Sequence, residues 1–79
     1  MRFLNIGSGN FVAIDRILTV ITPESAPIKR YIAKLRSEGM LMDLTSGRTS
    51  RSLIVLDNGQ AVLLPMHPET VVGRGEKTN

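Results

Sequence analysis

The chain has no cysteine and no tryptophan among its 79 residues. The lack of cysteine excludes disulfide bonds and thiolate metal sites. His67 is the single histidine, and no carboxylates cluster near it in the sequence, so no metal site is expected. A chain this short buries only about 60% of the surface that its unfolded form exposes. Because small folds depend on disulfides, metals or self-association, we expect this protein to form a homo-oligomer.

Long apolar runs are also missing. No window approaches the length that a membrane helix needs. The apolar residues at the beginning of the chain are interrupted at Gly7–Asn10, so they do not form the core of a signal peptide. The sequence therefore predicts a cytoplasmic protein without a membrane partner, and the absence of cysteine fits a reducing compartment.

The residues needed for catalysis are not grouped in this sequence. No serine has a base close to it, the aspartates are spread over separate turns, and His67 stands beside Pro68 in an expected loop. Gly7 and Gly9 resemble the start of a dinucleotide-binding motif, but the third glycine would fall at Val12. We expect no enzyme, no cofactor and no small-molecule ligand.

Positive charge gathers in the middle of the chain. The net charge of the whole chain is +3, whereas residues 28–51 hold six Lys or Arg and two Asp or Glu, a net charge of +4. Such a segment is a candidate patch for a polyanion. The alternative is an ordinary solvated helix face, and the sequence does not decide between the two.

The predicted fold is a small α+β domain over residues 1–72, with a mostly antiparallel sheet, one main helix and a flexible tail at 73–79. Strands rich in β-branched residues are expected at Phe3–Gly7, Phe11–Ile14 and Arg16–Thr22, with a glycine turn between the first two and a further short strand at Met40–Leu44.

The main helix is predicted at residues 26–38. Ser25 is its expected N-cap, Pro27 is tolerated in the first turn, and Gly39 ends it. Its apolar stripe consists of Ile28, Tyr31, Ile32 and Leu35. Its basic residues lie off that stripe and are Lys29, Arg30, Lys34 and Arg36. These cations either solvate the helix or face an acidic partner.

Asn58-Gly59 is a strong hairpin signal between strands at Arg51–Asp57 and Gln60–Pro65. Both strands are apolar at successive positions, so both of their faces must be covered. One helix cannot cover both faces, and we therefore expect other subunits to do so. His67–Thr70 is expected to form a turn before a short last segment.

The loop Thr45–Arg51 (TSGRTSR) carries two arginines with no acidic residue beside them. Gly47 permits a tight turn, and small hydroxyl side chains keep the tip of the loop low. Arg48 and Arg51 offer forked donors that suit phosphate oxygens. With two Phe and one Tyr there is no stacking platform for single strands, and one helix makes no helix-turn-helix. This pattern favours contacts to the phosphate groups of a polyanion.

Four stretches together resemble the extracellular matrix regulator RemA family of bacterial proteins. The similarity runs from residue 2 to about residue 72, and the string PESAPIKR is its most specific part. The stretches are FLNIGSGNFVAIDRI (Phe3–Ile17), ITPESAPIKRYI (Ile21–Ile32), GMLMDLTSGRTSRSLIV (Gly39–Val55) and HPETV (His67–Val71).

This resemblance implies a DNA-binding transcriptional regulator of biofilm-matrix genes. It implies a fold related to LytTR-type DNA-binding domains, assembly into a closed ring, and double-stranded DNA along the ring surface. The family's Gly-Arg-Arg-x-Arg loop places Arg48 and Arg51 at the DNA, and its Asn-Arg-Ile stretch places Arg16 there. For DNA as the ligand, we expect contacts to its backbone and reading of its shape rather than a helix in the major groove. Two positions depart from the pattern, since Thr49 replaces the second arginine of the loop and Asp15 replaces the asparagine before Arg16.

Two other functions remain open. One is an oligomeric scaffold that binds an acidic protein through the basic residues of the helix, and the other is an Sm-like ring that binds RNA. Binding to duplex DNA, single-stranded RNA and an acidic protein over a range of salt concentrations separates them.

Overall fold

The computed structural model describes residues 2–76, which form an α+β fold with two sheets and two helices. In chain order the elements are β1 (Phe3–Gly7), β2 (Asn10–Ala13), the 3-10 turn η1 (Ile14–Arg16), β3 (Ile17–Ile21), α1 (Ala26–Ser37), β4 (Leu41–Asp43), β5 (Ser52–Leu56), β6 (Ala61–Leu64) and α2 (Pro68–Glu76). The predicted α+β class is confirmed, but the second helix was not expected.

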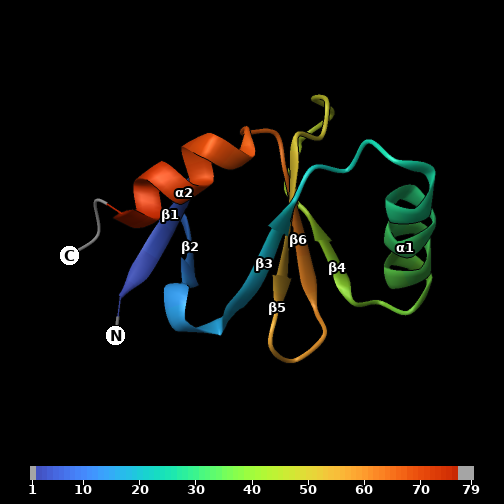
Figure 1. The fold of residues 1–79 in the computed structure, drawn as a ribbon, viewed down its shortest axis with the longest axis horizontal. Helices are drawn as coiled ribbons and strands as arrows, with labels where there is room; N and C mark the ends of the chain where they lie inside the picture. Colours follow the sequence, from blue (N-terminus) through green and yellow to red (C-terminus); the bar gives the residue numbers. More distant parts are fainter. Residues whose placement is uncertain (1, 77–79) are drawn as a thin grey trace.

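β1 and β2 form a separate antiparallel hairpin, as the glycine turn predicted (Figure 1). Gly7, Ser8 and Gly9 all have positive φ angles, of 98°, 53° and 78°. Glycine adopts this region without steric cost, whereas Ser8 is a non-glycine residue there. The hairpin aligns Leu4 with Val12.

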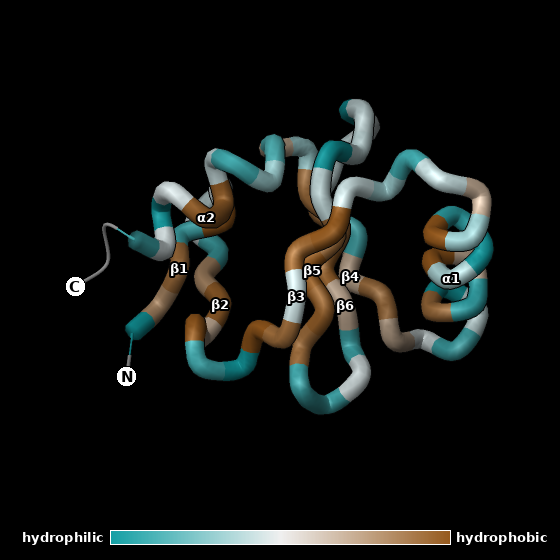
Figure 2. Tube along the Cα trace, viewed as in Figure 1, coloured by the Kyte–Doolittle hydropathy of each residue, from teal (hydrophilic) through white to brown (hydrophobic). Residues whose placement is uncertain are grey.

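The larger sheet has the strand order β3-β5-β6-β4. β5 and β6 form the hairpin predicted at Asn58-Gly59, and Leu53 pairs with Leu63 in its register. The β3–β5 and β5–β6 pairs are antiparallel, whereas β4 runs parallel to β6. The expectation of a mostly antiparallel sheet is confirmed. Figure 2 shows that the apolar residues concentrate along the central strands, while the connecting loops are polar.

α1 covers one face of this sheet. The hydroxyl of Ser25 accepts a hydrogen bond from the N–H of Ile28 at 3.4 Å, which confirms the predicted N-cap. Ile32 and Leu35 are buried against Leu53 and Leu63, and Ile28 and Tyr31 pack beside them. The predicted apolar stripe is therefore confirmed.

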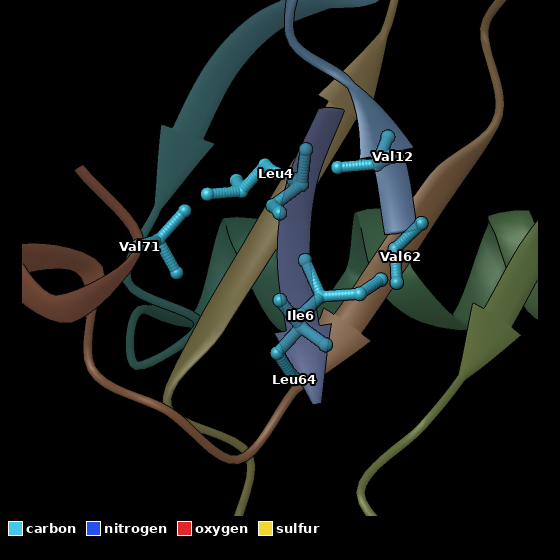
Figure 3. Packing of buried hydrophobic residues seen from close by; sticks show 7 residues of the cluster. Leu4, Ile6, Val12, Val62, Leu64 and Val71 are labelled. Atoms are coloured by element: carbon cyan, nitrogen blue, oxygen red, sulfur yellow. The ribbon is translucent and has the colours of Figure 1, made fainter. Parts of the chain in front are cut away.

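The opposite face of the sheet is covered by the same chain. Leu4, Ile6 and Val12 of the hairpin and Val71 of α2 form one buried cluster with residues of the sheet (Figure 3). The sheet residues of this cluster are Ile54, Val62 and Leu64. The expectation that other subunits must cover the second face of β5 and β6 is wrong. That expectation counted α1 alone, whereas the β1–β2 hairpin and α2 cover the second face of the sheet.

The region after β6 also differs from the expectation. The predicted turn and short last segment are the helix α2, which packs against β1 and buries Val71 to 2% exposure. Gly73 and Gly75 weaken its helical propensity, so docking onto the hairpin stabilises it. α2 includes residues 73–76 of the predicted flexible tail, and residues 77–79 of that tail lie outside the described residues. In residues 2–76 no helix has the length and apolar character needed to cross a membrane.

Candidate nucleic-acid interface

The loop Thr45–Arg51, called the arginine loop below, connects β4 to β5 and projects from one end of the larger sheet (Figure 1). Arg48, Thr49 and Arg51 are all exposed. Arg51 directly precedes β5, and its backbone N–H donates to the carbonyl of Leu64 on β6. The end of the loop is therefore fixed to the sheet, while the arginine side chains lie at the surface.

Asp43 shapes the beginning of this loop. Its Oδ1 accepts hydrogen bonds from the hydroxyl of Thr45 at 2.7 Å and from the N–H of Thr45 at 3.0 Å. These two bonds, followed by a weaker contribution from Arg36, hold the pKa of the Asp43 carboxyl below its ordinary value, although partial burial opposes the shift. Thr45 is buried, and its hydroxyl anchors the loop rather than lying at its tip.

A tight turn follows the anchor. The N–H of Arg48 donates to the carbonyl of Thr45 at 3.0 Å, and the two residues between them, Ser46 and Gly47, have φ angles of 54° and 81°. Positive φ at both central positions is the combination found in type I′ turns. The predicted role of Gly47 in a tight turn is confirmed.

Neither arginine of the loop has an ion pair with a carboxylate in residues 2–76. The Nε of Arg48 donates weakly to the carbonyl of Thr45 at 3.4 Å, so its charge is not neutralised. A shallow hollow of about 450 Å³ lies between Gly47, Arg48, Thr49, Arg51 and Pro65. The loop can therefore receive an anion on an exposed, positively charged surface.

Arg16 lies at the other end of the sheet. Its NH1 atom is 3.0 Å from Oδ2 of Asp57, and its backbone carbonyl accepts the N–H of Asp57. The neighbouring Asp15 is not the partner in this ion pair. Because Arg51 precedes β5 and Asp57 follows it, a strand rise of about 3.3 Å per residue separates these ends by roughly 20 Å. One chain does not bring Arg16 together with Arg48 and Arg51.

The basic residues of α1 form a third positive region. Lys29, Arg30 and Lys34 are exposed, and no ion pair involves them in the part of the chain that the structure describes. Arg36 differs, since its NH1 atom lies 3.4 Å from Oδ2 of Asp43. This pair connects the end of α1 to the anchor of the arginine loop.

Sequence reasoning missed Arg74. It was assigned to the tail, but in α2 it shares a hollow with Arg48. Two glycines beside it hid the helical pattern, so no periodic signal marked this arginine. No group of three or more His, Cys, Asp or Glu in residues 2–76 is arranged to hold a metal ion.

Comparison with known proteins identifies the family. A family model described as "RemA-like: Extracellular matrix regulatory protein A-like" matches residues 3–74. The chain belongs to this RemA-like family. Relatives in Bacillus cytotoxicus, Bacillus mycoides and Bacillus cereus are each 51% identical over 74 residues, which is 94% of this chain and 85% of each relative. Each of them is named a "Putative regulatory protein".

The RemA-like family and the names of these relatives support a regulatory role. They point to a regulator with a macromolecular partner rather than to an enzyme. The resemblance read from the sequence motifs is thus confirmed at the level of the family.

Proposed function

We propose that this protein is a DNA-binding transcriptional regulator of genes for the extracellular matrix of biofilms. Arg48 and Arg51 carry the proposal, because they are exposed on a well-anchored loop and have no carboxylate partner in residues 2–76. Guanidinium groups bind phosphate oxygens through two parallel hydrogen bonds, and phosphate contacts supply most of the sequence-independent affinity for DNA.

The contacts fall on the DNA backbone and read its shape rather than its bases. The arginines stand on a short loop, and the described part of the chain has no pair of helices arranged as a helix-turn-helix. Phosphate contacts position a protein on DNA without reading sequence, and sequence-dependent deformability then supplies a modest preference.

Self-association multiplies these few contacts. One chain offers the loop at one end of the sheet and Arg16 roughly 20 Å away at the other, a strand length at about 3.3 Å per residue. Repeating both ends around a closed homo-oligomeric ring provides many phosphate contacts at high effective concentration. The ring and the relation to LytTR-type domains rest on the family resemblance.

The decisive experiment measures binding of the full chain to duplex DNA over a series of salt concentrations. The logarithm of the binding constant should fall with the logarithm of salt concentration by roughly 0.9 per phosphate neutralised. Arg48→Ala and Arg51→Ala should each weaken binding and reduce this slope, with the mass of the assembly unchanged. Binding that is insensitive to salt and to both substitutions would contradict the proposal.

A second candidate is a scaffold for an acidic protein or RNA. The observation that favours it is the exposed row of Lys29, Arg30 and Lys34 on α1, which has no ion pair in the described residues. In the same salt series, single-stranded RNA and an acidic protein serve as competing ligands. This candidate is favoured if single-stranded RNA or the acidic protein binds more tightly than duplex DNA. That binding should be lost in Lys29→Ala and Lys34→Ala but kept in Arg48→Ala.

A further inference from the structure

A hollow of about 380 Å³ lies beside the arginine loop, between segments that are far apart in the sequence. One wall comes from the β1–β2 turn, with Gly7, Ser8 and Asn10. The others come from Arg48 of the loop, from the link between β6 and α2, and from Arg74 of α2. Among residues 2–76, two arginines and no carboxylate line the hollow, so it favours an anion.

The hollow is continuous with the surface of the arginine loop. Arg48 and Pro65 line both this hollow and the shallower one that contains Arg51. Arg51, Arg48 and Arg74 therefore follow one another along the same end of the molecule, from the loop toward α2. Arg16 is not part of this row, because it lies at the far end of β5.

Arg74 is held in position before any ligand arrives. Its NH1 atom donates a hydrogen bond of 2.9 Å to the carbonyl of Asn5, which joins α2 to β1. A guanidinium carries five N–H donors in a planar fork, so a side chain that holds a backbone carbonyl can also donate to an anion. A pre-positioned side chain loses less conformational entropy when a ligand binds.

We propose that this hollow binds a phosphate group of the DNA backbone, with Arg48 and Arg74 as its charged donors and the hydroxyl of Ser8 at its edge. The inference deepens the proposed function by adding Arg74 and Ser8 to the phosphate-binding surface. The backbone of one DNA strand then runs from the arginine loop into the hollow, and the β1–β2 hairpin takes part in binding as well as in the core.

Ser8→Asp is the most direct test, since it puts a carboxylate at the edge of the hollow without altering Arg74. Ser8 is exposed and has a φ of 53°, and Asp is among the residues that tolerate this backbone region. The carboxylate competes with phosphate for both arginines. Binding of the full chain to duplex DNA should weaken by at least about threefold, in line with the modest strength of exposed charge pairs. The salt slope should also fall.

Two control variants match this substitution. Ser8→Asn resembles Ser8→Asp in size and backbone tolerance but adds no charge, so it should weaken DNA binding less than Ser8→Asp does. Ser25→Asp adds the same charge at the N-cap of α1, where Asp caps as well as Ser, and it should also leave DNA binding unchanged. Equal weakening by Ser25→Asp would mean that net charge rather than the hollow governs binding, which would overturn the inference.

Arg74 is tested by a pair of variants. Arg74→Gln removes the charge and should weaken DNA binding, whereas Arg74→Lys keeps the charge and should retain part of the affinity. Thermal unfolding of both variants checks that they fold. If Arg74→Gln fails to fold, Ser8→Asp alone decides. If Arg48→Ala weakens binding while Ser8→Asp and Arg74→Gln bind as the parent does, the hollow is not a phosphate site and the proposed function stands. If the parent chain itself does not bind DNA, the proposed function fails first.

Discussion

The three candidate DNA-binding arginines differ in the contacts that they make before DNA binds. They are Arg16, Arg48 and Arg51. Arg16 already donates to Asp57, whereas Arg48 and Arg51 have no carboxylate partner in residues 2–76. A phosphate must displace Asp57 at Arg16 but displaces only water and a weak carbonyl contact at Arg48. The loop arginines are therefore expected to contribute more to binding than Arg16.

Thr49 offers a gain-of-function test at the residue scale. Thr49→Arg adds a cation to the exposed loop, so DNA binding should tighten and the salt slope should steepen by roughly 0.9 for each new phosphate contact. Thr49→Gln, which adds length without charge, is the control. Because Thr49 is exposed, unfolding free energies of both variants should stay within about 0.5 kcal/mol of the parent. No difference between the two variants would place the loop away from phosphates.

The Arg16–Asp57 pair gives a second test at this scale. Asp57→Asn removes the carboxylate that neutralises Arg16, so DNA binding should tighten. In the Arg16→Ala background the same change should have no effect, and the two results form a double-mutant cycle. The side chains are 62% and 39% exposed, so the pair contributes less than about 1 kcal/mol to stability and both variants should fold. A gain that persists without Arg16 would assign the effect to net charge alone.

At the scale of elements, the arginine loop depends on β4 for its anchor. Asp43 ends β4, and its carboxylate accepts two hydrogen bonds from Thr45. Arg36 of α1 contacts the other oxygen of that carboxylate. The position of the loop therefore depends on one side chain that joins strand, loop and helix.

Asp43→Ala should destabilise the fold by about 1 kcal/mol, the typical value for lost hydrogen bonds of a surface group. Asp43→Asn should cost less, because an amide oxygen still accepts from Thr45. Urea unfolding of the two variants checks this order. Equal stability of Asp43→Ala and the parent would show that the loop needs no such anchor.

The same carboxyl makes stability depend on pH. Its pKa in the folded state lies below the ordinary value of 3.8, so its contribution is complete above pH 3.8 and is lost as the pH falls through the folded-state pKa. The stability difference between the parent and Asp43→Asn should accordingly shrink as the pH drops below 3.8. A difference that grows toward acid pH would reverse the sign of this linkage.

α2 provides a further test at the element scale. Val71 is 2% exposed and Val72, its neighbour, is 50% exposed. Val71→Ala removes two buried carbon atoms, which should lower the free energy of unfolding by roughly 2 kcal/mol. Val72→Ala has the same chemistry on the exposed face and should change stability by less than about 0.5 kcal/mol. Equal effects in urea unfolding would contradict the docking of α2 on the hairpin.

At the scale of the whole molecule, each chain covers both faces of its own central strands, so burial of β5 and β6 does not require assembly. Large apolar side chains nevertheless remain at the surface. They are Phe3, Phe11, Leu18, Met42 and Val72. Scattered apolar residues are normal on a surface, and these side chains are available for contacts between subunits.

We expect a closed homo-oligomer in solution, because a core this small gains stability from association. Light scattering at micromolar concentration should give a mass that is a multiple of the 8.7 kDa chain. The same measurement with duplex DNA should show a further rise in mass. A mass of 8.7 kDa at all concentrations would remove the ring from the proposed mechanism.

Local patterns in the sequence determined much of the fold. Ser25, the apolar stripe and Gly39 predicted α1, Asn58-Gly59 predicted the β5–β6 hairpin, and Gly47 predicted the turn of the arginine loop. These features depend on neighbours within a few residues. Helix capping, the spacing of apolar residues and the turn residues are therefore sufficient to predict them. The motifs spread along residues 2–72 also identified the RemA-like family.

Only the tertiary structure decided how distant segments meet. α2 contains two glycines, and it is stabilised because Val71 packs against the hairpin. The sequence of α2 does not specify this contact. The hairpin and α2 thereby cover the sheet face that had been assigned to other subunits. In the same way, long-range packing pairs Arg16 with Asp57 and brings Arg74 beside Arg48. The sequence shows which residues carry charge, and the packing of distant elements determines which charges are neutralised and which share a surface.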